Sequence, residues 1–332
     1  MGHRASYVLI EDGRTHIYGS TIGALTVAQD VLLGPGGTAR YIRSLSPLDT
    51  LYDHTWGEGG ILLDADQKRL LLWGGQRIAG KPYLRRVYLA LLRPLWSGWQ
   101  IEWAAQEMVD FARYIGVDLS TILNEPYAPP YIYSNNAVPV ATLLTIRDDH
   151  GQIRDYGFAD VTERLLLPGE QRLQGILAAH RSISLPHERG NIDGGAYLNV
   201  GDREMWVWNR GAVDPRYLDM LGDTWDGWRI DYHIEGLVRQ AVLSGRDPRP
   251  IMVPNSEAVA DVMDDLAMVD IESVDPLGVI KHLTGVSVPV TASSYLSNAP
   301  NFARAAQERL RILEQFLVHR SVSTETLDTT MP

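Results

Sequence analysis

Short apolar runs alternate with turn residues along the first third of the chain. Residues 6–20 read as two alternating strands around Asp12–Gly13, a dipeptide that favours two-residue hairpin turns. A second pair of apolar runs, residues 61–63 and 70–73, flanks a charged turn and predicts another hairpin. Elsewhere apolar residues recur at helical spacing, and Gly116 is placed to end the last of these helices. This order indicates an α+β fold with a largely antiparallel sheet, whose helices cover one face.

One aromatic motif is written twice. Residues 96–103 read WSGWQIEW, and residues 225–232, which begin 129 positions later, read WDGWRIDY. In a strand, alternate residues from Trp99 to Trp103 share one face, as do those from Trp228 to Tyr232. Aromatic side chains bury large areas, so we expect this face to be core. An aromatic platform for a ligand is the alternative.

The resemblance between the two halves extends beyond this motif. Residues 58–75, EGGILLDADQKRLLLWGG, align without a gap on residues 193–210, DGGAYLNVGDREMWVWNR. We therefore predict two tandem copies of a β-β-α-α-β-β-α-β-α unit in a pseudo-symmetric arrangement, with a period too long for a short-repeat solenoid. The predicted parts are repeat unit 1 (5–118), a Pro- and Tyr-rich linker (119–139), repeat unit 2 (140–247), a helical C-terminal extension (248–320) and a flexible tail (321–332).

The extension is predicted from three helical patterns. Residues 255–268 begin with Asn255 or Ser256 as N-cap and carry an apolar stripe. A shorter helix is expected within 276–285, and a longer one within 302–320. The longer helix is expected to dock on the body, with a coiled-coil dimer as the alternative.

Composition narrows the function classes. The chain of 332 residues has no cysteine, which excludes disulfides, thiolate catalysis and Cys-ligated zinc. The net charge of −11 disfavours nucleic acid and favours a neutral or basic protein partner. No apolar run is long enough to span a membrane, and we expect a cytoplasmic protein.

The familiar catalytic motifs are missing from the sequence. There is no G-x-S-x-G elbow, no G-x-x-x-x-G-K-[ST] loop and no H-E-x-x-H zinc motif. Accordingly, no cofactor and no metal are predicted.

Two aligned turns carry the candidate chemistry. One holds His54 and Glu58, and the other holds His187 and Asp193. A histidine with a carboxylate can perform acid/base chemistry, which makes these four residues the candidate catalytic set. The acid-Gly-Gly sequence alone is shared by both turns, so Glu58 and Asp193 have a structural alternative as caps of loop N–H groups. Candidate ligand-binding residues are the aligned Trp73 and Trp208.

Two functions remain open. The first hypothesis is a non-enzymatic, acidic protein-interaction module, either neutralising or adaptor, supported by its charge and nine tryptophans. The alternative is a hydrolase or transferase with an acid/base site in the cleft between the two units, where duplicated folds commonly hold pockets. Which side chains converge on that cleft decides between them.

Overall fold

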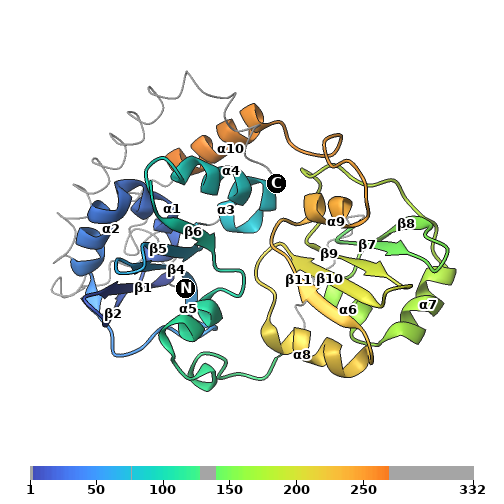
Figure 1. Ribbon diagram of the computed structural model, residues 1–332, viewed down its shortest axis with the longest axis horizontal. Helices are drawn as coiled ribbons and strands as arrows, with labels where there is room; N and C mark the ends of the chain where they lie inside the picture. The colour runs from blue at the N-terminus through green and yellow to red at the C-terminus, as the bar shows by residue number, and fades with distance from the viewer. Residues whose placement is uncertain (1–2, 76, 128–139, 269–332) are drawn as a thin grey trace, which may run out of the picture.

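The computed structural model describes residues 3–75, 77–127 and 140–268. Figure 1 shows two lobes side by side, each built around its own sheet. The predicted helices within 276–285 and 302–320 and the predicted tail lie outside the described residues. Within those residues, no helix is long and apolar enough to cross a membrane.

The first lobe contains a six-stranded sheet in the order β3-β2-β1-β4-β5-β6. Asp12 (φ 52°) and Gly13 (φ 68°) form its first turn in left-handed conformations, as the predicted hairpin requires. The strands are β1 (Arg4–Glu11), β2 (Arg14–Ser20), β3 (Ser46–Pro47), β4 (Gly57–Asp64), β5 (Arg69–Trp73) and β6 (Gln100–Trp103).

The second lobe contains a five-stranded sheet in the order β11-β10-β9-β7-β8. Its outer strand β11 is formed by the last four residues of the second copy of the aromatic motif. The strands are β7 (Thr142–Arg147), β8 (Ile153–Phe158), β9 (Gly194–Asn199), β10 (Glu204–Asn209) and β11 (Arg229–Tyr232).

The two sheets share strand order and strand direction. Across the sheet, the order β2-β1-β4-β5-β6 of the first lobe corresponds to β8-β7-β9-β10-β11 of the second. The registers agree as well, because Gly60 pairs with Trp73 in one lobe and Gly195 with Trp208 in the other. The order is the one that the predicted duplication requires; the duplication itself stays a hypothesis about origin.

The expectation of a largely antiparallel sheet is wrong. β1 runs parallel to β4 and β5 to β6, with matching parallel pairs in the second sheet. Helices lie between the paired strands in the chain, and such long crossovers are what parallel pairing needs. Helices also cover both faces rather than one, because successive residues of β4 and β9 are buried.

The helices follow the predicted order, with additions in the first lobe. The second lobe has α6 (Thr162–Leu166), α7 (Glu170–Ala178), α8 (Pro215–Thr224) and α9 (Leu237–Leu243). The first has α1 (Val27–Asp30), α2 (Gly34–Arg43), α3 (Arg77–Gly80), α4 (Pro82–Leu92) and α5 (Met108–Ile115), with short 3-10 turns η1 (Gly23–Leu25), η2 (Val31–Leu33) and η3 (Leu119–Thr121). Gly116 ends α5 in the left-handed conformation, as predicted.

The aromatic motif anchors each lobe through its first tryptophan. Trp96 and Trp225 are 1% and 2% exposed, and each indole N–H donates to a backbone carbonyl at 2.8 Å. On the predicted core face along Trp99–Trp103, Trp103 is buried and the other residues are only partly buried. The corresponding face along Trp228–Tyr232 is partly buried throughout. β6 and β11 are edge strands, which leaves one side of each open.

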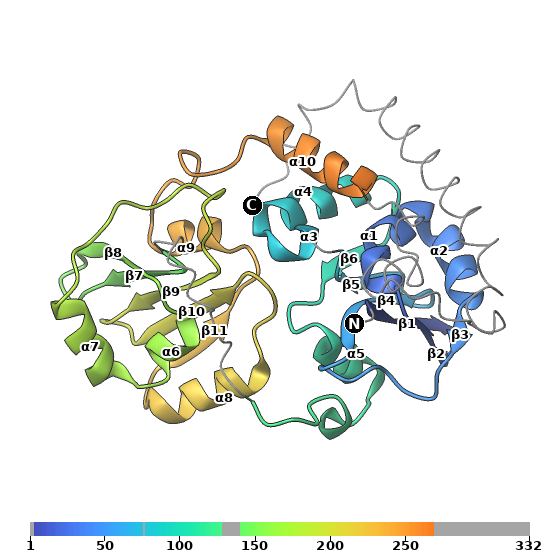
Figure 2. The same ribbon diagram turned by 180° about the vertical axis from the view of Figure 1, so that it is seen from behind.

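The last described helix, α10 (Asn255–Met268), crosses back from the second lobe onto α4 of the first (Figure 2). Tyr83 donates to Asp261 at 2.9 Å, which fixes the helix to α4. Val262 and Leu266 of the predicted apolar stripe are buried in the core, together with Ala258, and Val259 and Met263 of the stripe pack against it partly buried. This part of the extension therefore belongs to the body of the molecule.

A buried arginine joins the two lobes. Arg85 of α4 is 2% exposed and has no acidic hydrogen-bond partner among the described residues. Its guanidinium donates at 2.8–2.9 Å to the carbonyls of Ala79, Arg210 and Ile234, of which the last two belong to the second lobe. Arg85 therefore holds the chain around Arg210 against the first lobe.

Candidate functional site

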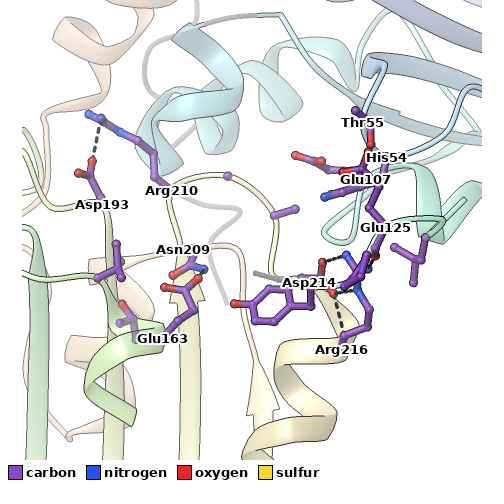
Figure 3. Close-up of a pocket in the computed structure, with 18 of the residues that line it drawn as sticks. His54, Thr55, Glu107, Glu125, Glu163, Asp193, Asn209, Arg210, Asp214 and Arg216 are labelled. Carbon is purple, nitrogen blue, oxygen red and sulfur yellow. Dashed lines mark hydrogen bonds and ion pairs between the residues drawn. The ribbon is translucent and has the colours of Figure 1, made fainter. Parts of the chain in front are cut away.

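A cavity of about 570 Å³ lies between the two lobes. The first lobe and the segment after it contribute His54, Glu107 and residues 123–127. The second lobe contributes the ends of its sheet and the starts of α6 and α8. Figure 3 shows Glu163, Asn209 and Asp193 on one side and His54 and Glu107 on the other.

Glu163 forms the polar wall on the second lobe. It is the second residue of α6, and its carboxylate accepts a hydrogen bond of 2.6 Å from the Asn209 amide at the end of β10. Burial, the largest cause, raises the pKa of Glu163, and the nearby Asp214 raises it further. Its carboxyl group has no ion-pair partner among the described residues.

Two arginines of the pocket are already paired. Arg210 binds Asp193 at 2.9 Å, and Arg216 binds Asp214 at 2.6 Å (Figure 3). Asp214 also accepts the N–H of Arg216, and so caps the start of α8. These pairs fix the pocket rim and neutralise both cations.

Glu107 has a backbone conformation that few non-glycine residues adopt. It precedes α5 with φ 54° and ψ −126°, a region that is nearly restricted to glycine. Gly236 precedes the corresponding helix α9 with φ 62° and ψ −137°. The same turn is thus present in both lobes, and only the first lobe places a carboxyl group there.

The environment of Glu107 changes its acidity. Burial of the carboxyl group, the largest cause, raises the pKa of Glu107 to about 7, although the Arg85 guanidinium and the Ala212 N–H oppose the rise. The residue is partly exposed towards the cavity. A carboxyl group with a pKa near neutrality can both donate and accept a proton at physiological pH.

The strand end that borders the cavity in the second lobe is covered by other residues in the first lobe. Where the second lobe has Gly194 beside Thr162 and Asn209, the first has Gly59 packed on Ala24 and beside Gly74. Ala24 belongs to η1, which lies in the longer link between β2 and α1; the link between β8 and α6 is only residues 159–161. The fold itself therefore demands neither the cavity nor its polar lining.

The four predicted catalytic residues separate into two groups. His54 and Asp193 line the cavity, on opposite lobes. Glu58 instead lies 2.7 Å from the His3 ring, and the His187 ring accepts the Arg189 N–H, both outside the lining. The predicted set does not converge, because the two acid-Gly-Gly turns belong to separate lobes whose equivalent corners do not face each other.

The predicted ligand-binding tryptophans do not line the cavity. Trp73 is 5% exposed and Trp208 2%, and both are packed within the cores of their lobes. The physical reason is that each ring covers a glycine of the neighbouring strand, Gly60 or Gly195, and is thereby enclosed.

Glu107 and Glu163 were missed by sequence reasoning. The signal for Glu107 was present, since it aligns with Gly236 at the same 129-position offset as the tryptophan motif. A glutamate opposite a glycine before a helix marks a turn whose φ favours glycine. For metals, the described residues contain no group of three or more histidine or acidic side chains that could hold an ion.

The fold and site together define a two-lobed α+β protein with an acidic cavity at the junction of its lobes. Comparison with protein-family models, curated proteins and solved structures gives no match.

Proposed function

We propose that the protein is an enzyme of the hydrolase or transferase class, with Glu107 as the general acid/base in the cavity between the lobes. The supporting observation is the strained backbone of Glu107, in a turn where the other lobe has glycine. Such a conformation costs about 1–3 kcal/mol and is kept where function needs the side chain.

The chemistry of the cavity agrees with this role. Glu107, with a pKa of about 7, faces a pocket in which the Asp214 carboxylate raises the pKa of both Glu107 and Glu163, in addition to the larger effect of burial. Perturbed acids that share a cleft are typical of active sites. Arg85 holds the Arg210 carbonyl, and the Ala212 N–H donates to Glu107, so the loop and the acid position each other.

The alternative of a protein-interaction module has less support. A docking surface of this kind needs exposed aromatic side chains, yet among the described tryptophans only Trp56, at 52%, is largely exposed. The other exposed large apolar residues of the described chain are Ile183, which follows α7 in a loop, Met220 of α8 and Val242 of α9. The acidic charge alone does not define a docking surface.

Two substitutions of Glu107 test the proposal. Glu107→Gln keeps the size but cannot transfer a proton, and should lower turnover of 4-nitrophenyl esters, glycosides or phosphates, or of amino-acid anilides, by about 100-fold or more. Glu107→Gly should leave the melting temperature unchanged or higher, because glycine relieves the strain. Asp219→Asn, on the exposed side of α8, is the control.

Full turnover in the Glu107→Gln variant would contradict the proposal. A markedly lower melting temperature for Glu107→Gly would also contradict it, since Glu107 would then be retained for stability.

A further inference from the structure

We propose that the cavity binds an organic cation, a primary ammonium or a guanidinium group, with Glu163 as its principal ligand. This inference rests on the proposed function for its relevance to a substrate, but the binding can be tested alone. It follows from the charge of the lining, from the hydrogen bonds already made there and from two buried hydroxyl groups.

The charge of the lining is strongly unbalanced. Five carboxyl groups line the cavity, against two arginines that are both paired. Anionic ligands would meet this field without a free arginine to receive them, and a neutral ligand would leave it uncompensated. The five acids are Glu107, Glu125, Glu163, Asp193 and Asp214.

Hydrogen-bond donors of the lining are largely used within the protein. The Asn209 amide donates to Glu163, the Thr142 hydroxyl to the Asp160 carbonyl, and the Arg216 guanidinium to Asp214 and the Glu125 carbonyl. What the cavity offers is mainly acceptors, the remaining lone pairs of its carboxyl groups. A ligand that fits must bring donors, and ammonium and guanidinium groups carry nothing else.

Two phenol groups beside Glu163 add an independent observation. Tyr217 is 1% exposed and stacks on Tyr127 with ring centres 6.2 Å apart. Neither buried hydroxyl has a hydrogen-bond partner among the described residues, and both lie in the electrostatic field of Glu163. A cation held by Glu163 would stabilise its ionised form, and an ionised carboxylate can accept from a phenol that lacks a partner.

The first lobe offers a comparison within the same molecule. Its equivalent corner is filled by Ala24, and α1 begins with Val27 and Ala28. The acid of α1, Asp30, is buried and accepts hydrogen bonds from Tyr7 and Thr26. A cation site is therefore expected on the second lobe alone.

Calorimetric titration with agmatine, which carries both cationic groups, tests the proposal on the wild-type protein at neutral pH. We expect saturable binding with release of protons, seen as a different apparent enthalpy in phosphate and in HEPES buffers, because a bound cation ionises the neighbouring carboxyl groups. Glu163→Gln should weaken binding about tenfold or more, and Asp219→Asn should change it little.

The uncharged 1,5-pentanediol is the matched ligand and should not bind. Equal binding of diol and agmatine, or agmatine binding without proton release, would overturn the inference, and so would no agmatine binding. These outcomes do not depend on turnover: cation binding with full activity in Glu107→Gln would contradict the proposed function alone, whereas loss of turnover in that variant without cation binding would contradict this inference alone.

Discussion

The two lobes have the same strand order, but they differ at the strand end that carries Gly59 in the first lobe and Gly194 in the second. This corner of the fold is packed in the first lobe and open to the cavity in the second. In the first lobe η1 covers the ends of β1 and β4 with Ala24 and Leu25, both buried. In the second, a shorter link leaves Gly194 and Asn209 at the wall of a cavity. Because one fold tolerates both, the polar corner reflects a requirement other than folding.

The lobes also differ in the turn before their last helix, and here the first lobe carries the polar residue. The residue before the last helix of each lobe has a positive φ. In the second lobe this residue is Gly236, which adopts the conformation without strain. In the first lobe it is Glu107, whose backbone is strained there. The cavity therefore combines an open corner from one lobe with an acid from the other, which neither lobe could supply alone.

The largest expected effect tests what the lobes share. Trp96→Ala and Trp225→Ala should each lower the free energy of unfolding by about 3–5 kcal/mol, since each removes a buried ring and its hydrogen bond. The two losses should be similar, as measured by urea unfolding. A small loss in only one lobe would show that the motif anchors the lobes differently.

The next expected effect is a loss of stability at acidic pH, caused by a position at which the two lobes carry different residues. His233 is buried, whereas the first lobe has Ala104 there, and desolvation lowers the pKa of His233 to about 3. As pH falls below 6.5, His233 of the unfolded chain becomes protonated, whereas His233 of the folded protein stays neutral until about pH 3. The folded protein therefore loses stability relative to the unfolded chain as pH falls through this window. Glu235 and Arg239 are its charged neighbours.

His233→Ala should remove this acid sensitivity, which amounts to at most about 5 kcal/mol. Urea unfolding of both proteins at neutral pH and at mildly acidic pH measures it. An unchanged pH dependence in the variant would show that the pKa of His233 is the same in the folded and the unfolded chain, which would contradict the predicted shift.

A smaller effect compares the two strand tryptophans. Trp208 donates to Gln240 at 2.6 Å, whereas the Trp73 indole N–H is buried without a partner among the described residues, beside Phe111. Trp208→Phe leaves a buried amide oxygen unpaired, and Trp73→Phe removes an unpaired donor. Trp208→Phe should therefore cost about 1–3 kcal/mol more than Trp73→Phe. Equal losses by chemical denaturation would mean that the N–H of Trp73 is satisfied.

Local features of the fold could be predicted from the sequence because local chemistry determines them. Asp12–Gly13 and Gly116 adopt the left-handed conformations that their positions favour. Parallel pairing of β1 with β4 could not be predicted, since it depends on how α1 and α2 pack rather than on the strands themselves. Glu58 aligns with the pocket residue Asp193 in the sequence, but it belongs to the other lobe and lies outside the cavity lining.

The role of Glu107 as the acid of the site could not be predicted from the sequence for a different reason. The acidity of Glu107 depends first on its burial and then on Arg85 and Ala212, which are distant from it in the chain; Ala212 belongs to the second lobe and meets Glu107 only where the lobes join. Sequence alignment of the two units indicates its strain through Gly236, but not its chemical environment.

The most direct test of the account is the pKa of Glu107 itself, followed by NMR of the side-chain carboxyl carbon in ¹³C-glutamate-labelled protein, with Glu107→Gln to assign the signal. The predicted result is a midpoint near pH 7, against an ordinary value of 4.5. In that case the unfolded chain ionises first as pH rises, and wild-type stability falls between these two values, by at most about 3 kcal/mol relative to Glu107→Gln. A midpoint at or below the ordinary value would contradict the assignment of Glu107 as the acid/base group.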